Sequence, residues 1–354
     1  MQLPDIIETA IKANASDIHL TVDLPPVVRV NGRLLRMGKS KLTPADTLGF
    51  AQIVLSDAQF EKYRVDNEFD ASYTYDNGAK KYYFRVNVFR QKNNCGLVMR
   101  LIPTEIPTLE KLNLPEVFRQ LCMKRRGLIL VTGPTGSGKT TTLAAMLEYM
   151  SRMRNEHIIT IEDPIEYVFP HGVGIINQRQ LGADTASFES AIRSAMREDP
   201  DVIMIGEMRD LNTISAALTA AETGHLVLST LHTIGAAKTI DRVIDVFPAE
   251  QQSQVRVQLG SVLEAVVSQQ LLPNRTGTGR KLAMEIMLSN HAIANQIREG
   301  KTGQIQNLMQ MSSGEGMITM DQSLLELYRK GQIDANAALK YSVDTAELQR
   351  RMGM

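Results

Sequence analysis

The chain has little cysteine, and this shortage excludes two classes of protein. Its 354 residues include two cysteines, Cys95 and Cys122. Two thiols cannot form a disulfide framework, and without C-x-x-C spacing they do not indicate a zinc site, so we expect both to be reduced and unpaired. A four-cysteine zinc insertion is excluded for the same reason.

Net charge and long apolar runs are also missing. Lysine plus arginine number 39 and aspartate plus glutamate number 39, so a general attraction to nucleic acid is absent and we expect no direct nucleic-acid partner. The apolar runs Leu128–Val131 and Val202–Ile205 are far shorter than the roughly 20 residues that span a bilayer. The N-terminus lacks a basic segment before an apolar one, which predicts a cytoplasmic protein.

The chain does contain a glycine-rich loop between an apolar run and a helical pattern. Residues 128–142 read Leu-Ile-Leu-Val-Thr-Gly-Pro-Thr-Gly-Ser-Gly-Lys-Thr-Thr-Thr and fit the phosphate-loop pattern G-x-x-x-x-G-K-[ST]. Glycines let backbone N–H groups surround phosphates, the helix start favours their charge, the lysine reaches the β- and γ-phosphates, and the next hydroxyl can bind Mg²⁺. We therefore predict an ATP and Mg²⁺ site at Gly133, Pro134, Thr135, Gly136, Ser137, Gly138, Lys139, Thr140 and Thr141, with Thr140 as a metal ligand.

The first part of the chain is rich in strand patterns. Residues 25–34 predict a strand that meets an Asn-Gly turn, and residues 82–89 and 97–102 predict a hairpin. Helical segments are expected around 4–14 and 43–63. We predict an N-terminal domain over 1–102, followed by a proline-punctuated linker over 103–115.

The second part alternates apolar runs with helical patterns. The runs 128–131, 157–161, 202–205 and 226–229 are candidate buried strands, and their alternation with helices predicts an α/β fold with a largely parallel sheet covered on both faces. We place this core at 116–290. Residues 291–354 become helical and indicate no catalytic role of their own.

Acidic residues follow two of these runs, at the strand ends where parallel sheets bind ligands. Glu162 follows 158–161, and Glu207 follows 202–205 after Gly206, which stands where many phosphate-loop enzymes carry a Mg²⁺-binding aspartate. Hydrolysis needs carboxylates for Mg²⁺ and for water. We expect Glu207 to hold Mg²⁺ and water and Glu162 to be the base, with exchanged roles as the alternative. Caps or solvated turns explain equally well the other acidic residues, Asp163, Glu166 and Asp210.

Two histidines flank the run at 226–231. His225 and His232 do not have the spacing of a zinc-binding pair. His232, at the carboxyl end of the run, is expected to sense the γ-phosphate through a hydrogen bond. A purely structural role is the alternative for both histidines.

Motifs along nearly the whole chain resemble the secretion ATPase superfamily, specifically the retraction ATPases of type IV pili. The motifs are residues 15–20, 29–32, 160–167, 176–182, 191–201, 206–210, 229–233 and 320–323. The resemblance implies a RecA-like P-loop ATPase core with an N-terminal PAS-like α+β domain and a helical C-terminal region. It matches the acidic segments to the family's Asp box and Walker B, and residues 224–233 to its His box.

The same resemblance implies that arginines of the N-terminal domain complete the site by offsetting charge on the phosphoryl group. The candidates are Arg85, Arg90 and Arg100, and we favour Arg85 and Arg100 as catalytic residues. Arg85 and Arg90 are five residues apart on one strand, so they are expected to point to opposite faces. A solvated sheet face is the alternative for each arginine.

The resemblance further implies a homohexameric motor for pilus retraction and twitching motility. Its implied partner is an inner-membrane platform protein, with peripheral association at the cytoplasmic face. The family's segment Ala-Ile-Arg-Asn-Leu-Ile-Arg-Glu is Ala-Ile-Ala-Asn-Gln-Ile-Arg-Glu here, with Ala294 and Gln296 as departures, which keeps an accessory or second retraction motor as an alternative. Pilus extension or type II secretion ATPases, a nucleic-acid translocase and a non-hydrolysing scaffold are weaker alternatives.

Overall fold

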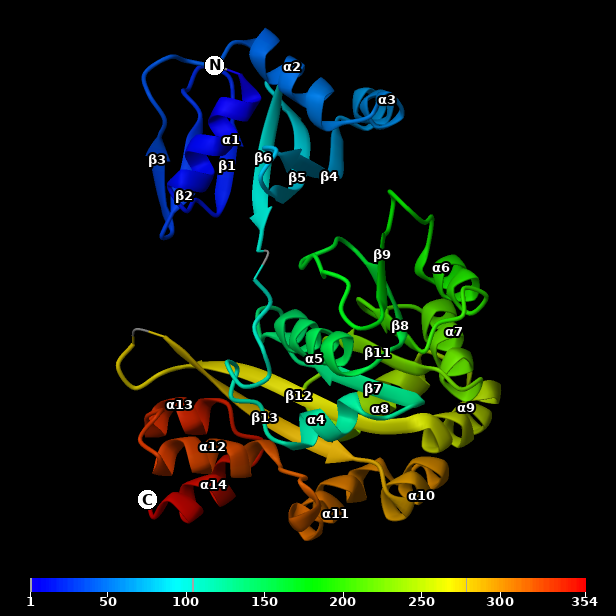
Figure 1. Cartoon of the computed structure of the whole chain (residues 1–354). Helices are drawn as coiled ribbons and strands as arrows, with labels where there is room; N and C mark the ends of the chain where they lie inside the picture. The colour runs from blue at the N-terminus through cyan, green and yellow to red at the C-terminus, as the bar shows by residue number, and fades with distance from the viewer. Residues whose placement is uncertain (1, 104, 278) are drawn as a thin grey trace. The chain divides into compact units, whose positions relative to one another are not determined.

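The computed structural model describes residues 2–103, 105–277 and 279–354, which form two compact units. The first unit comprises Met1–Glu105 and Pro164–Val168, and the second comprises Ile106–Asp163 and Phe169–Met354. The chain therefore passes between the units at residues 105–106, again at 163–164, and finally at 168–169. Figure 1 labels the elements of both units.

The first unit is built on an antiparallel sheet in the order β3-β2-β1-β6-β5-β4. Its strands are β1 (Asp17–Leu20), β2 (Val27–Val30), β3 (Arg33–Arg36), β4 (Glu68–Asp76), β5 (Lys81–Gln91) and β6 (Asn94–Ile102). The Asn-Gly turn joins β2 to β3 as predicted, because Asn31 and Gly32 have φ of 49° and 80°. Its helices are α1 (Leu3–Lys12), α2 (Pro44–Val54) and α3 (Asp57–Asp66).

The helical structure expected around 43–63 is present as two helices, α2 and α3. The Thr43 hydroxyl accepts a hydrogen bond from the Asp46 N–H and caps the first helix. The Ser56 hydroxyl accepts one from the Gln59 N–H and caps the second. Because a serine cap satisfies the N–H groups of a new helix start, it favours a break in the helix at this point.

One face of the first sheet forms the core of the unit. Phe84, Val86 and Val88 of β5 are buried, whereas Tyr83 and Arg85 on the other face are half-buried. This alternation has the period of two expected for a sheet with one covered face. The buried side chains pack with those of α1 and α2, including Leu3 and Phe50.

The second unit contains a seven-stranded sheet in the order β13-β12-β7-β11-β10-β8-β9. Its strands are β7 (Gly127–Thr132), β8 (His157–Glu162), β9 (Ile175–Gln180), β10 (Val202–Ile205), β11 (Leu226–Leu231), β12 (Leu263–Pro273) and β13 (Arg280–Leu288). Neighbouring strands are parallel except β12 and β13. The parallel sheet and the predicted strands are confirmed.

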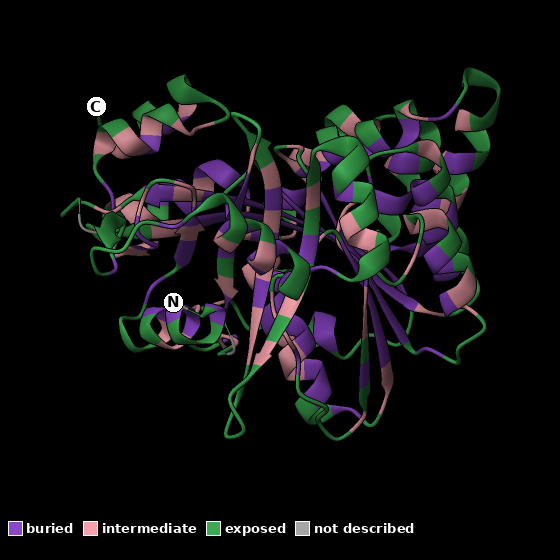
Figure 2. Cartoon of the chain, turned by 90° about the horizontal axis from the view of Figure 1, so that it is seen from above, coloured by how far each residue is buried: buried purple, intermediate pink, exposed green. Residues whose placement is uncertain are grey.

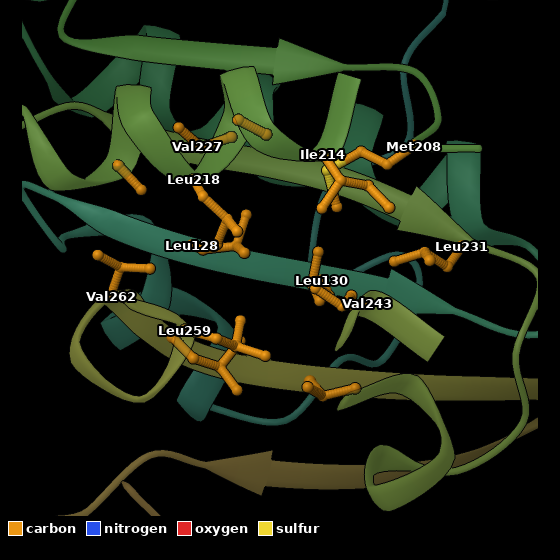
Figure 3. Close-up of a cluster of buried hydrophobic side chains, with 14 of the residues drawn as sticks. Leu128, Leu130, Met208, Ile214, Leu218, Val227, Leu231, Val243, Leu259 and Val262 are labelled. Carbon is orange, nitrogen blue, oxygen red and sulfur yellow. The ribbon is translucent and has the colours of Figure 1, made fainter. Parts of the chain in front are cut away.

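Helices pack on this sheet and bury its central strands. They are α4 (Val117–Cys122), α5 (Lys139–Met153), α6 (Phe188–Ala195), α7 (Leu211–Glu222), α8 (Ala236–Asp245), α9 (Ala249–Val262), α10 (His291–Glu299) and α11 (Ile305–Met311). Every residue of β7 and of β11 is buried, and Figure 2 colours the buried residues of the chain purple. In Figure 3, Leu128 and Leu130 of β7 lie among side chains of α7, α8 and α9, including Leu218, Val243 and Leu259. Burial of each such side chain stabilises the fold by about 1.5–3 kcal/mol.

The last helices form a smaller core on the β12–β13 hairpin. They are α12 (Met320–Arg329), α13 (Ala335–Lys340) and α14 (Thr345–Met352). Leu272 of β12 and Ala283 of β13 pack against Leu324 of α12 and Leu348 of α14. The C-terminal region is therefore helical, as predicted, and it shares the sheet of the second unit.

Within the described ranges, no helix combines the length and the apolar character that crossing a bilayer requires.

Candidate functional site

The phosphate loop connects β7 to α5. Gly133, Gly136 and Gly138 have φ of 137°, 78° and 94°, which residues with side chains rarely adopt. A Cβ atom on Gly133 would lie 2.3 Å from the carbonyl oxygen of Gln269 and 2.7 Å from Ser137 Oγ, whereas one on Gly136 would meet nothing within 4 Å. Packing and conformation therefore both require glycine at 133, and conformation alone requires it at 136.

Polar groups of the loop are directed at its own interior. Lys139 Nζ donates to the carbonyl oxygen of Gly133 at 2.8 Å and to that of Pro134 at 3.2 Å. Ser137 Oγ is buried and has no hydrogen-bond partner among the described residues. Buried polar atoms without partners are uncommon in native proteins. A loop with an inward-facing ammonium group and an unpartnered hydroxyl is suited to a ligand that brings phosphate oxygens.

A buried amide fixes the helix that follows the loop. Gln269 Nε2 donates to Thr142 Oγ1 at 2.8 Å, which joins the first turn of α5 to β12. Beside it, Ser268 of β12 lies opposite Thr132, the last residue of β7. No sequence motif identified Gln269, because β12 itself was not predicted.

The expected acidic residues and His232 lie at one edge of the sheet. The strands β7, β11, β10 and β8 are parallel neighbours in that order, so their carboxyl ends share this edge. His232 follows β11, Glu207 follows β10, and Glu162 ends β8. Because neighbouring strands are about 4.8 Å apart, His232 lies nearest the strand of the phosphate loop and Glu162 farthest.

Glu162 is buried and held by two neighbours. Its side chain is 4 % exposed. Thr160 Oγ1 donates to Glu162 Oε1 at 2.6 Å, and Gln178 Nε2 of β9 donates to the same oxygen at 3.0 Å. These bonds fix the orientation of the carboxylate, as a catalytic base requires. Gln178 lies in one of the motifs of the family resemblance, but its contact with Glu162 was not foreseen.

Gly206 joins the two acidic segments. Its N–H donates to the carbonyl oxygen of Ile161 at 2.8 Å. A Cβ atom at this position would lie 3.3 Å from that oxygen and 3.5 Å from Glu162 Cα. An aspartate would press on the end of β8, so the glycine permits the close approach of β10 and β8.

Glu207 lies between two nitrogen groups. Arg209 Nε is 2.6 Å from Glu207 Oε1, and His232 Nε2 is 3.4 Å from Glu207 Oε2. The residue expected to hold Mg²⁺ and water and the residue expected to sense the γ-phosphate are thus in contact with each other. His225 lies at the opposite end of β11, where its Nδ1 is 2.9 Å from the carbonyl oxygen of Ala220, so the structural interpretation applies to it.

The other acidic residues have structural roles or lie exposed. Asp210 caps α7, because it accepts hydrogen bonds from the Thr213 N–H at 2.9 Å and from the Thr213 hydroxyl at 2.7 Å. Partial burial raises the pKa of Asp210, but the hydrogen bonds from Thr213 lower it by more, so the pKa lies below its ordinary value. Asp163 and Glu166 are exposed, which fits the solvated-turn interpretation.

In the first unit, a row of charged residues crosses the face of the sheet opposite its core. Arg29, Asp17, Arg100 and Arg85 lie directly opposite one another on β2, β1, β6 and β5. Arg100 Nε is 2.8 Å from Asp17 Oδ1, and Arg29 Nε is 3.7 Å from Asp17 Oδ2. Asp17, on the strand between β2 and β6, therefore offsets the repulsion between Arg29 and Arg100.

The strand register also separates the candidate arginines. The pairing of β5 with β4 and β6 runs without a shift, so Arg85 and Arg90 point to opposite faces, as the alternation predicts. Arg90 Nη1 donates to Asn67 Oδ1 at 3.1 Å at the end of the strand. Asp17 lies in the N-terminal motif of the resemblance, but its bond to Arg100 was not predicted.

These features define a phosphate-loop nucleotide-binding protein with a RecA-like core, a PAS-like N-terminal α+β domain and a helical C-terminal region. The chain belongs to the family of type II/IV secretion system proteins, whose model matches residues 2–349.

Comparison with known proteins gives particular relatives. The type IV pilus retraction ATPase PilT of Pseudomonas aeruginosa is 46% identical over 338 residues, which cover 96% of this chain and 97% of PilT. The type IV pilus ATPase PilU of the same organism is 39% identical over 99% of this chain and 91% of PilU. The crystal structure of the pilus retraction motor PilT with bound ADP has a TM-score of 0.91 and 48% identity, covering 99% of each chain.

Proposed function

We propose that this protein hydrolyses ATP at the phosphate loop and, as a homohexamer, drives the retraction of type IV pili and twitching motility. The observation that carries the proposal is the similarity to a retraction ATPase over 96% of this chain. A phosphate loop that depends on glycine at several positions supports the nucleotide part of the proposal. We assign residues 1–102 to the N-terminal domain, 103–115 to a linker, 116–290 to the ATPase core and 291–354 to the helical C-terminal region.

The residues present fit ATP and Mg²⁺. Lys139 exchanges its loop carbonyls for phosphate oxygens, and the unpartnered Ser137 hydroxyl gains a partner. Thr140 and Glu207 would hold Mg²⁺, which when bound neutralises charge on the phosphates. No group of three or more His, Cys, Asp or Glu suited to a metal occurs in the described parts of the chain. Two protein ligands suffice for Mg²⁺, which completes its shell with phosphate and water.

Hydrolysis requires a base that activates water, and Glu162 is our candidate. Thr160 and Gln178 orient its carboxylate. Glu207 lies closer in strand order to the phosphate loop, which favours it as the metal and water ligand, and the exchanged assignment remains the alternative. His232, in contact with Glu207, is positioned to report the γ-phosphate to that carboxylate.

The carboxylates are tested with Glu162→Gln and Glu207→Gln in the full chain, with Asp163→Asn as the exposed control. We expect both glutamine variants to retain nucleotide binding and to lose ATP hydrolysis at least about 100-fold, the range of a lost general base. Nucleotide affinity measured with and without Mg²⁺ distinguishes the metal ligand from the base, because only the variant that has lost the metal ligand should bind nucleotide more weakly in the presence of Mg²⁺. Unchanged hydrolysis in both variants would refute the assignment.

Arg85 and Arg100 are proposed to complete the site from the N-terminal domain of a subunit in the ring. Their guanidinium groups offset charge on the transferred phosphoryl group. At most one is expected to contact the γ-phosphate, and Asp17 holds Arg100 by a 2.8 Å bond. Equal ATPase rates of monomer and hexamer would argue against a composite site.

The biological output is tested with a gene-deletion strain scored for piliation and surface motility. Excess pili without motility is the result expected for a retraction motor working on an inner-membrane platform protein, at the cytoplasmic face. Loss of pili would indicate extension and overturn the proposal. An accessory motor of the PilU kind is the second candidate, supported by 39% identity to PilU and by Ala294 and Gln296 in the segment 292–299. Persistent retraction in the deletion strain would favour it.

A further inference from the structure

Glu285 is a buried carboxylate that joins two helix starts in the second unit. It lies on β13 and is 6% exposed. Its Oε1 accepts a hydrogen bond from the Ala236 N–H at 2.7 Å, and its Oε2 accepts one from the Met320 N–H at 3.3 Å. Ala236 and Met320 are the first residues of α8 and α12. The negative charge therefore faces the positive ends of both helices.

The α8 side of this bridge continues the loop that carries His232. The Gly235 N–H donates to Ser268 Oγ at 2.9 Å, immediately before the Ala236 bond. Ser268 lies opposite Glu285 on the β12–β13 hairpin and opposite Thr132 on β7. The end of the loop is thus fastened to the hairpin next to the strand of the phosphate loop.

The α12 side of the bridge leads to the C-terminal helices. Asp321, next to Met320, accepts hydrogen bonds from the N–H groups of Val343 at 2.7 Å and Asp344 at 2.9 Å. Asp344 is in turn the cap of α14. The start of α12 is therefore tied to the start of α14.

Attachment of α12 to the sheet does not depend on Glu285. The Met284 N–H donates to Ser323 Oγ at 3.1 Å, and Ile286 and Ile318 exchange two backbone hydrogen bonds. Among the described residues, Glu285 adds a direct link between α8 and α12, because its one carboxylate accepts a hydrogen bond from the start of each helix. Burial raises the pKa of its carboxyl, and the hydrogen bonds from Ala236 and Met320 offset this only in part.

We propose that Glu285 is a positioning residue that couples the nucleotide state of the His232 loop to the C-terminal helices α12–α14. This inference rests on the proposed function, because it requires the loop to respond to nucleotide. When the loop changes position, the start of α8 moves, and the shared carboxylate moves the start of α12 with it. The Ala236 bond, at 2.7 Å, has the length of a charge-assisted hydrogen bond, and the Met320 bond is longer, at 3.3 Å. Because both bonds end on one carboxylate, a displacement at the start of α8 changes the bond at the start of α12.

The test compares hydrogen exchange of the full chain, by mass spectrometry, with and without ADP or a non-hydrolysable ATP analogue. In the wild type we expect nucleotide to change exchange in the phosphate loop, in 232–236 and at the starts of α12 and α14. In Glu285→Gln we expect the first two responses to remain and the third to fall at least about 3-fold. Ser323→Ala is the matched control, because it removes a bond between β13 and α12 that does not involve α8, and it should keep all three responses.

Ala236→Pro tests the same link from its other end and remains informative if Glu285→Gln fails to fold. Proline is well tolerated at the first position of a helix, and it removes only the N–H that Glu285 Oε1 accepts. It should also suppress the response of α12 and α14. A response of these helices that persists in both variants would overturn the coupling, as would a wild type whose phosphate loop responds while α12 and α14 do not. If the phosphate loop itself shows no response to nucleotide in any variant, the proposed function fails and the coupling with it.

Discussion

Replacement of glycines in the phosphate loop separates packing from conformation. Gly133 and Gly136 both have positive φ, at 137° and 78°, so alanine is strained at either position. The surroundings differ: the new Cβ would lie 2.3 Å from the Gln269 carbonyl oxygen at position 133 and would have no neighbour within 4 Å at position 136. Gly136→Ala is therefore the matched control for Gly133→Ala.

The expected magnitudes follow from these contacts. Backbone strain of an alanine costs about 1 kcal/mol or somewhat more at 136, whose φ of 78° is close to the left-handed helical region, and more at 133, whose φ of 137° lies outside it. At Gly133 the overlap with backbone and with Ser137 Oγ adds about 2 kcal/mol, as in an overpacked core. The entropy that alanine removes from the unfolded chain is the same for both variants. The difference of at least about 2 kcal/mol corresponds to about 30-fold or more in the equilibrium for opening the second unit.

Hydrogen exchange of the slowest amides in β7 and β12 measures this opening in the full chain. Gly133→Ala should exchange at least about 30-fold faster than Gly136→Ala at these strands, while amides of β5 in the first unit serve as the internal reference and should be unaffected. Equal acceleration by the two substitutions would refute the packing argument. No acceleration by either would refute the assigned backbone conformation.

Further predictions concern a cap, a buried pair and an ion pair. Asp210→Ala removes the α7 cap and should cost about 1 kcal/mol, seen as faster exchange in the first turn of α7, whereas loss of hydrolysis without faster exchange would instead indicate a chemical role. Gln269→Leu leaves the buried Thr142 hydroxyl unsatisfied and should cost about 1–3 kcal/mol; in a double-mutant cycle with Thr142→Val the costs should be less than additive, and full additivity would argue against the bond. Partial burial raises the pKa of Asp17, but the hydrogen bonds from Arg100 and Ser16 lower it overall. The ionised Asp17 carboxylate therefore stabilises the pairing of β1 and β6 above about pH 4, and this stabilisation is lost as the pH falls through the lower pKa of the folded state. Protection factors of these strands, corrected for intrinsic exchange, should drop in acid in the wild type and be flat in Asp17→Asn; an equal drop in both would contradict the assignment.

The sequence was sufficient to predict the strands whose residues are apolar and followed by helices. The strands β7, β8, β10 and β11 were expected because each is a short apolar run. Three further strands of the second sheet were not. β9 reads Ile-Ile-Asn-Gln-Arg-Gln and lies at the edge of the sheet, so only part of it is buried and its pattern is mostly polar.

The hairpin β12–β13 was missed for another reason. The last residue of α9 is Val262 and the first of β12 is Leu263, so no glycine, proline or polar turn marks the change from helix to strand. The residues around the junction, Ser261-Val262-Leu263-Glu264, mix polar and apolar side chains without a periodicity that locates the boundary. Gln269 and Glu285 lie on these two strands, and their contacts therefore could not be foreseen.

The part of the candidate site that forms a local motif was predictable from the sequence. The phosphate loop depends on a fixed spacing of glycine, lysine and threonine, and it folds as expected. Contacts between segments distant in the chain were not predictable. Gln178 reaches Glu162 from β9, His232 reaches Glu207 from β11, and Asp17 reaches Arg100 from β1, because strand order brings together residues that no local pattern relates.

The path of the backbone after Glu162 has a mechanical consequence. The chain leaves the second unit at residue 163, contributes Pro164–Val168 to the first, and returns at residue 169. A change in the relative orientation of the two units would require torsion changes at each of the three crossings, and the crossing at 163–164 lies within two residues of the carboxylate proposed to activate water. We therefore expect that shortening or stiffening this five-residue segment changes the proposed ATP hydrolysis together with any movement between the units.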